Sequence, residues 1–276
     1  MTAPQKTPTR LILDRSHSNS THIFPVTLGF RAGAISASFL IVYAAAKQLD
    51  VAPEEFEVLE PRIIVDATSG RRVPMLQIAD MLINGSGLCE RLGIPEKSGV
   101  PFVGEIMRNI VNAKAEYPLF DLMEAGHRER CDQACYVCMQ RFGNQPYHGL
   151  LDWRLGLDVI GILLDPAFEA GIDGNFSTPG LVDWPKLARR NAEETSRLLP
   201  GSEIRTIDGI ELVSLGNPSG AWMAVIHPFW DWDAVLSDKP ALADFATEHT
   251  VRPATTFDLA RRLVSTVDNC RRSTVQ

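Results

Sequence analysis

The chain has 276 residues, 45% of them hydrophobic, and a formal net charge of −7. This length supports one large domain or two smaller ones. The acidic balance excludes a global basic field that attracts nucleic acid, so contact with DNA would be local or made by a partner. The N-terminus lacks a signal-peptide pattern, and the longest apolar run, residues 35–46, is too short to span a bilayer, so we expect a cytoplasmic protein with no membrane contact.

The N-terminal part of the chain predicts a mobile segment followed by a domain of mixed structure. Residues 1–20 are polar and are expected to be flexible. The domain over residues 21–165 should begin with an apolar strand, a helix buried on several sides and two short strands broken by Pro61, at 21–30, 35–49, 56–60 and 62–66. Hydrophobic periodicity then predicts helices at 102–114, 119–125 and 150–164.

The rest of the chain, residues 166–276, is expected to form a smaller C-terminal α/β subdomain. Residues 165–182 are rich in Gly, Asp, Asn and Pro, which favours a boundary there. The pattern beyond it predicts an amphipathic helix, three short strands and a terminal helix capped by Thr255 or Thr256, at 184–199, 203–207, 211–215, 222–227 and 257–267. The expected fold class is α+β, with helices around short sheets.

Cysteine spacing is the most informative feature of the sequence. Three of the five cysteines, Cys131, Cys135 and Cys138, fall within eight residues, while Cys89 and Cys270 lie far away. An odd number of cysteines with three clustered argues against a disulfide framework and for a reducing compartment. Thiolates at this spacing can converge on one metal ion, so we expect a structural Zn²⁺ site. An iron–sulfur cluster uses similar ligands and stays as an alternative.

Three thiolates leave one position of a tetrahedron open, and the residues offer several candidates for it. Cys89 would close an all-thiolate site if the fold brought it near, although a buried cysteine without a metal is common. His148 follows Cys138 by ten residues and could instead cap a helix or pack in the core. His127 is a weaker third choice.

The residues around this run resemble the zinc-binding domain that ends many bacterial superfamily 2 DNA helicases, a group that includes the Mrf-type repair helicases and the DISARM phage-defence proteins. The resemblance covers roughly residues 20–165 and is specific in Cys131-Asp-Gln-Ala-Cys135-Tyr-Val-Cys138, Asn144-Gln145, His148 and Leu151-Asp152-Trp-Arg154. It is looser at Asn84-Gly85-Ser86-Gly87-Leu88-Cys89, and at the alanine-rich segment 35–49 with Glu54 and Glu55 after it.

The departures from this family change what the resemblance implies. Many members carry an additional thiol where this chain has Glu129, which favours Cys89 as the fourth ligand. No G-x-x-x-x-G-K-[ST] loop occurs in the chain, so it has no Walker-type ATP site. The resemblance therefore implies a non-enzymatic zinc-binding accessory subunit. It would act with a DNA helicase or translocase in DNA repair or anti-phage defence, reaching DNA through that complex.

Two alternatives remain at this point. A metal-dependent nuclease-like subunit would use Asp208 and Glu211, but two carboxylates without a following lysine are a weak pattern. A scaffold that binds only protein would explain the tryptophan-rich run 222–232, if those rings are exposed and not part of a core. Asn144, Gln145 and the pair Asp152 and Arg154 could likewise contact phosphates or serve only turns and helix caps.

Overall fold

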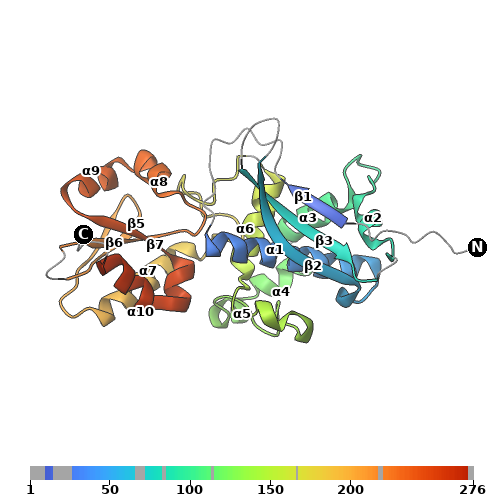
Figure 1. Cartoon of the computed structure of the whole chain (residues 1–276), viewed down its shortest axis with the longest axis horizontal. Coiled ribbons are helices and arrows are strands. Elements are labelled where there is room, and N and C mark those ends of the chain that lie inside the picture. The colour runs from blue at the N-terminus through green and yellow to red at the C-terminus, as the bar shows by residue number, and fades with distance from the viewer. Residues whose placement is uncertain are drawn as a thin grey trace, which may run out of the picture. The chain divides into compact units, whose positions relative to one another are not determined.

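The computed structural model describes residues 10–14, 27–65, 72–82, 85–112, 115–165, 167–216 and 220–272 (Figure 1). The fold is mixed α+β, as the sequence predicts, with helices around two small sheets. The chain divides into two compact units, an N-terminal unit of Met1–Thr21 with Arg31–Phe168 and a C-terminal unit of His22–Phe30 with Glu169–Gln276. Each unit has its own sheet and its own covering helices.

The sheet of the N-terminal unit is antiparallel, with strand order β1-β3-β2. Its strands are β1 (Arg10–Asp14), β2 (Phe56–Val65) and β3 (Arg72–Asp80). The two short strands expected around Pro61 are one continuous strand, whose register shifts between Leu59 and Arg62. Pro61 is accommodated because β2 is an edge strand and the irregularity removes the need for a ladder N–H at that residue.

The helices of this unit surround a core formed largely by α1 and α6. The described helices, including the short 3-10 helices η1 and η2, are α1 (Leu28–Leu49), η1 (Pro53–Glu55), α2 (Leu88–Gly93), α3 (Phe102–Asn112), α4 (Leu119–Met123), α5 (Ala125–Arg130), η2 (Phe142–Tyr147) and α6 (Trp153–Leu164). The helices predicted at 102–114, 119–125 and 150–164 correspond to α3, α4 and α6. Helix α6 begins at Trp153 because the Asp152 carboxylate caps it, accepting a hydrogen bond from the Leu155 N–H at 3.3 Å.

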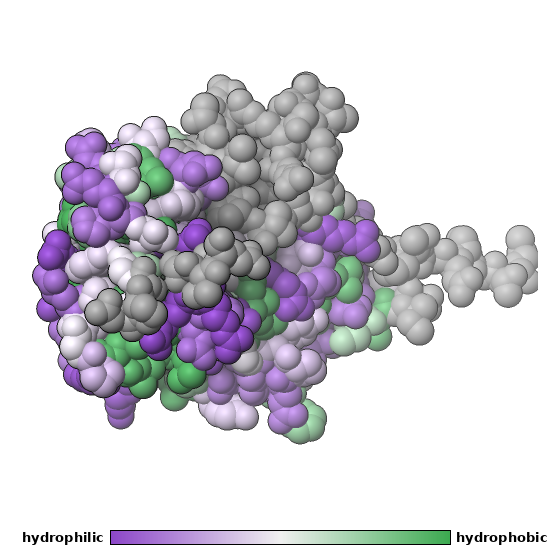
Figure 2. Space-filling model, turned by 60° about the vertical axis from the view of Figure 1, so that its left-hand side comes forward, coloured by the Kyte–Doolittle hydropathy of each residue, from purple (hydrophilic) through white to green (hydrophobic). Residues whose placement is uncertain are grey.

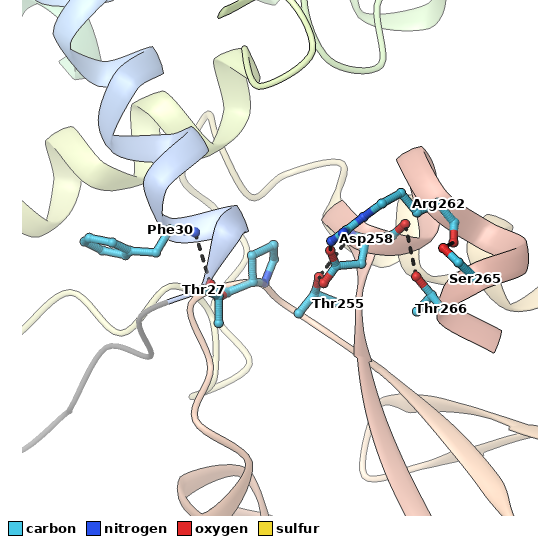
Figure 3. A network of polar contacts seen from close by, with 8 residues as sticks. Thr27, Phe30, Thr255, Asp258, Arg262, Ser265 and Thr266 are labelled. Atoms are coloured by element: carbon cyan, nitrogen blue, oxygen red, sulfur yellow. Dashed lines mark hydrogen bonds and ion pairs between the residues drawn. The ribbon is translucent and has the colours of Figure 1, made fainter. Parts of the chain in front are cut away.

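Helix α1 begins earlier than the sequence predicts. Residues 28–30, expected to end a strand, form its first turn, and Thr27 caps it by accepting a hydrogen bond from the Phe30 N–H at 3.1 Å (Figure 3). The other expected strand residues, 21–26, lie outside the described residues. By length and composition α1 could cross a membrane, but 83% of its most apolar window is buried within the protein. Such burial is consistent with the core helix of a soluble protein.

Helices α1 and α6 cross at a very short distance. A Cβ atom placed on Gly156 of α6 would lie 3.0 Å from Leu40 Cδ1, 3.0 Å from Ser36 Cβ and 3.1 Å from the Ala37 nitrogen. The Asp152 N–H also donates a hydrogen bond to Ser36 Oγ at 2.8 Å. The small residues of α1 are therefore required for contact with α6, which in turn holds the segment containing the clustered cysteines.

The C-terminal unit has a four-stranded sheet of order β4-β5-β6-β7, antiparallel except for the parallel β6 and β7 pair. Its elements are α7 (Trp184–Leu198), β4 (Ile204–Ile207), β5 (Ile210–Ser214), β6 (Trp222–Ile226), α8 (Trp232–Asp238), α9 (Pro240–Glu248), β7 (Val251–Thr255) and α10 (Thr256–Arg272). Helices α7 and α10 pack together on one face of this sheet, and α8 and α9 lie on the other side (Figure 1). Every residue of β6 is buried, as is Trp230, so most of the tryptophan-rich run is core.

Polar contacts fix the start of α10. Thr255 accepts a hydrogen bond from the Asp258 N–H at 3.1 Å, so it is the cap that the sequence expected (Figure 3). Arg262 has non-helical backbone angles and pairs with Asp258, while the Thr266 hydroxyl donates to the Asp258 carbonyl.

In the face drawn in Figure 2, hydrophilic side chains predominate and hydrophobic ones form small separate patches.

Candidate metal centre

Four side chains of the N-terminal unit converge after helix α5. They are His127, Cys131, Cys135 and Cys138, whose potential ligand atoms all lie within 4.8 Å of one another. The predicted convergence of the three cysteines is present in the structure. His127, Cys131 and Cys138 are buried and Cys135 is partly exposed. The four residues form a cluster that could hold one metal ion.

Local backbone geometry explains how twelve residues supply four converging groups. His127 and Cys131 are one helical turn apart, and the Cys131 N–H donates to the His127 carbonyl at 2.8 Å as α5 ends. The N–H groups of Cys138, Met139 and Gln140 all donate to the Cys135 carbonyl, at 3.1, 3.0 and 2.9 Å. This tight turn directs the Cys135 and Cys138 side chains to the same side as Cys131.

The sulfur separations match a tetrahedral site of single-ion size. Cys138 Sγ lies 3.8 Å from Cys131 Sγ and 3.7 Å from Cys135 Sγ. A tetrahedron with metal–sulfur bonds of about 2.3 Å has edges of about 3.8 Å. The sulfurs are too far apart to be bonded as disulfides, for which the S–S distance is about 2.0 Å. The spacing therefore fits thiolates arranged around one ion.

The fourth position is filled by the His127 ring, and its hydrogen bonding is that of a metal ligand. Nδ1 lies 3.1 Å from the Leu122 carbonyl oxygen, so it carries the proton and donates. Nε2 is buried and meets no donor or acceptor with hydrogen-bond geometry, and the His127 side chain lies close enough to Cys138 to help lower the pKa of that thiol. An unpaired buried nitrogen is unfavourable unless something else satisfies it. A backbone carbonyl on the far nitrogen is also the usual way in which a ligating histidine is oriented.

The cluster perturbs its own thiols in opposite directions. The hydrogen bond between Cys131 and Cys138 holds the pKa of Cys138 well below its usual value, helped by the Cys135 N–H, which donates to Cys138 Sγ at 3.1 Å. The same hydrogen bond, together with burial, raises the pKa of the Cys131 thiol far above its ordinary value. The two thiols are therefore coupled through their hydrogen bond, and a cation between them would compete with its proton.

Helix α6 supports the cluster from one side. Trp153 Nε1 and Arg154 Nη1 donate to the Cys131 carbonyl at 3.3 and 3.1 Å, and Arg154 Nη1 also reaches the Asp132 carbonyl at 3.0 Å. The buried Arg154 guanidinium lies 4.1 Å from the centre of the Trp153 ring. Arg154 therefore binds backbone carbonyls of the turn, and Asp152 caps helix α6. These are the structural roles, and not the phosphate contacts, that the sequence left open.

Helix α1 supports the other side through Tyr43 and Asn144. The Asn144 amide donates to Tyr43 Oη at 2.8 Å and to the Met139 carbonyl at 2.9 Å, while Tyr43 Oη itself donates to that carbonyl at 3.1 Å. The Asn144 side-chain oxygen accepts from the Arg141 N–H at 2.8 Å. Asn144 is therefore buried and fully used in fixing the turn, whereas Gln145 is exposed.

The sequence favoured Cys89 as the fourth ligand, and the structure assigns Cys89 a different position. Its Sγ lies 3.5 Å from the Ile78 carbonyl, and its N–H donates at 2.8 Å to Asp80 at the end of β3. The Asp80 carboxylate also accepts from the N–H of Gly87, whose φ of 80° favours glycine. The glycine turn is thus held by Asp80, and Cys89 is a buried cysteine at the start of α2. Asn84 of this motif lies outside the described residues.

The alternative ligand, His148, is also used elsewhere. Its Nε2 lies 2.9 Å from Asn144 Oδ1 and 3.0 Å from the Arg141 carbonyl. Both partners are acceptors, so this nitrogen carries a proton and has no lone pair for a metal. His148 therefore reinforces the turn after Cys138. His127, which sequence reasoning ranked third, takes the fourth position.

The acids proposed for a nuclease each have a structural partner. Glu211 accepts hydrogen bonds from Arg189 Nη1 at 3.0 Å and from the Thr206 hydroxyl at 3.1 Å. Asp208 lies in the turn between β4 and β5 and accepts from the Leu242 N–H of α9 at 3.0 Å. Among the described residues, the only group of histidine, cysteine and acidic side chains arranged to hold a metal is the one at His127.

Comparisons with models of protein families, with curated proteins and with solved structures found no match to this chain. The assignment of a function therefore rests on the site itself and on the sequence pattern around it.

Proposed function

We propose that this chain is a non-enzymatic accessory module built around a structural zinc ion. The observation that carries the proposal is the ligand set, three converging cysteines and a histidine whose free nitrogen faces them. Four protein ligands complete a tetrahedron and leave no position for water or substrate, which is typical of structural and not catalytic zinc.

The donor set and its size favour zinc over the alternatives. Soft thiolates with one imidazole suit Zn²⁺, whereas Mg²⁺ and Ca²⁺ take oxygen ligands. A [4Fe–4S] cluster binds each cysteine on a different iron, and a [2Fe–2S] cluster binds no more than two on one iron. Neither arrangement brings one ligand sulfur close to two others, as Cys138 Sγ is at 3.8 and 3.7 Å. When bound, the ion would supply no chemistry beyond holding the turn, and its binding energy would be folding energy.

The setting we propose is a complex with a superfamily 2 helicase or translocase that acts in DNA repair or anti-phage defence. The support is the resemblance over the cysteine run and the residues after it. In this structure Asn144, His148 and Arg154 all bond backbone carbonyls of residues 131–141, the metal-bearing turn of the proposed zinc site. The residues that carry the resemblance are therefore ones that hold this turn in its folded form. The chain also lacks a Walker motif, so a motor would be contributed by the partner.

Metal content tests the first part of the proposal. Protein purified without chelator should carry about one zinc per chain by plasma mass spectrometry. Cys135→Ser should lose the metal and lower the melting temperature, while Cys270→Ser, a change to a remote cysteine, should keep it. Wild-type protein that is free of metal, or whose melting temperature is unchanged by chelation, would contradict a structural zinc.

Co-expression tests the second part. Where the gene has a neighbouring superfamily 2 helicase that lacks its own terminal zinc domain, the two chains should co-elute in size-exclusion chromatography. The Cys135→Ser variant should not co-elute. Separate elution of two folded, metal-loaded proteins would count against the helicase partnership but not against the zinc module.

Two other functions remain testable. A nuclease would cleave DNA with Mg²⁺ or Mn²⁺ and lose that activity in Glu211→Ala; because Glu211 is paired with Arg189, we expect no cleavage in either protein. A scaffold for protein alone would form the complex with its neighbour but show no shift of DNA at low salt.

A further inference from the structure

A pocket of about 230 Å³ lies beside the metal-bearing turn, within the N-terminal unit. Its lining combines two tyrosines and two cations with apolar side chains, namely Tyr43, Tyr117, Lys47, Arg141, Ala46, Val51 and Pro53. Arg141 follows Cys138 by three residues, and Tyr43 is the residue that anchors the turn to α1. The pocket is therefore built from the same backbone that the proposed zinc would hold.

The two cations are positioned over the two aromatic rings. Lys47 Nζ lies 5.1 Å from the centre of the Tyr117 ring, and the Arg141 guanidinium carbon lies 5.4 Å from the centre of the Tyr43 ring. Neither cation pairs with a carboxylate in the part of the chain that the structure describes. Two cations without an ion-pair partner at one pocket favour an anionic group there, with Glu54 and Asp121 as the acids that act on the same two tyrosines.

Two exposed aromatic residues belong to the same turn as Arg141, which lines the pocket. Phe142 is 85% exposed and Tyr136 is 67% exposed, which is unusual for rings of this size. Arg141 is linked to both residues, because it precedes Phe142 in the chain and its Nη1 donates to the Tyr136 carbonyl at 3.0 Å. The turn thus carries one cation and two exposed rings within residues 136–142.

We propose that this surface, made of Lys47, Arg141, Tyr136 and Phe142, binds single-stranded nucleic acid. Two neighbouring backbone phosphates would bind at the two cations, one at each, and neighbouring bases would stack on the two exposed rings. Aromatic platforms beside a positive groove are how proteins bind single strands without reading sequence. The proposal deepens the accessory function and rests on it, since a helicase partner produces single strands.

The composition favours nucleic acid over a protein partner at this surface. Arginine, tyrosine and phenylalanine occur both in protein interfaces and in single-strand sites, whereas lysine is depleted in the centres of protein interfaces, so Lys47 is the residue that favours nucleic acid. A duplex would offer no free base faces to the rings. Because the net charge of −7 opposes binding, the affinity should be modest and should depend on salt. Two phosphate contacts give a slope of log K against log[salt] of about −1.4 for single strands.

The test uses the full-length, zinc-loaded protein and fluorescence anisotropy with labelled oligothymidylate, oligouridylate and a duplex of equal length. Both single strands should bind more tightly than the duplex. The single strand with the higher affinity indicates whether the natural ligand is DNA or RNA. Phe142→Leu keeps the apolar bulk but removes the aromatic face, so affinity should fall about 5- to 150-fold. Phe142→Tyr should bind as the wild type does.

Charge variants separate phosphate contact from stability. Lys47→Gln should weaken binding and reduce the salt slope by about 0.7, and Arg141→Gln should do the same. Arg108→Gln, an equal change of charge at an exposed position on α3, should have no effect. Zinc content and melting temperature are measured for each variant, because Arg141 also bonds two carbonyls of the turn.

Zinc-loaded wild-type protein that binds no oligonucleotide would overturn the inference and leave the zinc module intact. Equal binding by the wild type, Phe142→Leu and Lys47→Gln would overturn it as well. Loss of the helicase complex in Phe142→Leu, without any oligonucleotide binding by the wild type, would identify the surface as a protein interface instead. Absence of zinc from the purified protein would refute the accessory module itself.

Discussion

Replacing His127 by alanine tests the fourth ligand directly. In the metal-free protein the change removes the hydrogen bond to the Leu122 carbonyl, worth about 1 kcal/mol. It also removes a buried ring packed 5.8 Å from the Trp153 ring centre, and a large-to-small core change of this kind costs about 2–3 kcal/mol. The free energy of unfolding without zinc should therefore fall by about 3 kcal/mol.

In the presence of zinc the loss should be larger. A ligand that binds only the folded state stabilises it by about 4 kcal/mol when its free concentration is a thousandfold above Kd. His127→Ala leaves three ligands and should forfeit most of this gain. The combined loss of about 7 kcal/mol approaches the whole stability of an ordinary domain. His127→Cys is the matched control, because it loses the same ring but keeps a fourth ligand.

The assay combines zinc titration against a chromogenic chelator with urea unfolding at zero and saturating zinc. His127→Ala should bind zinc weakly and gain little stability from it, whereas His127→Cys should gain nearly as much as the wild type. Cys89→Ala and His148→Ala should each keep about one zinc per chain, although both lose internal contacts. The reasoning is refuted if His127→Ala holds zinc at wild-type affinity, and most clearly if Cys89→Ala does not.

Three further outcomes follow from the same geometry. Tyr43→Phe should lower the free energy of unfolding by about 1–3 kcal/mol in urea at unchanged zinc content, since Asn144 loses a buried acceptor. Gly156→Ala should cost about 1–3 kcal/mol because its Cβ meets α1, whereas Gly93→Ala, with nothing within 4 Å, should be close to neutral; equal melting temperatures would refute the close crossing. Zinc binding at pH 7 should release at least one proton, because the raised pKa of Cys131 keeps that thiol protonated, and affinity should fall as the pH falls. Calorimetry in buffers of different ionisation enthalpy measures this number, and a value of zero would contradict it.

Much of the fold was accessible from periodicity, and the parts that were not have identifiable causes. Long helices such as α3, α6 and α7 have a clear repeat of apolar residues, so pattern alone locates them. Strands β1, β3 and β7 have no counterpart among the predicted elements. Strand β1 lies in the segment 1–20 that was expected to be flexible, and β3 and β7 each contain a proline, which usually argues against a strand. Both are tolerated for different reasons: β7 is an edge strand, and Pro74 of β3 lies near one end of its ladder with β2.

The candidate site divides in the same way. Cys131, Cys135 and Cys138 were predictable because their convergence needs only one turn of backbone. The choice of Cys89 followed a family pattern and required a long-range contact that no local signal encodes. His127 did have a local signal. It precedes Cys131 by four residues, and residues four apart on a helix share a face. This signal is usable only if the short helix α5 is predicted, and its six residues, three of them charged, have no helical pattern of apolar residues.

The placement of all four ligands in one short segment has a consequence for the order of events during synthesis. His127 to Cys138 spans twelve residues, whereas a site closed by Cys89 would span fifty. Closing the shorter loop costs about 1.3 kcal/mol less chain entropy. An ion could therefore bind as soon as this segment leaves the ribosome, before α6 and the strands of the C-terminal sheet have emerged. The metal would then act as an early nucleus on which later elements assemble.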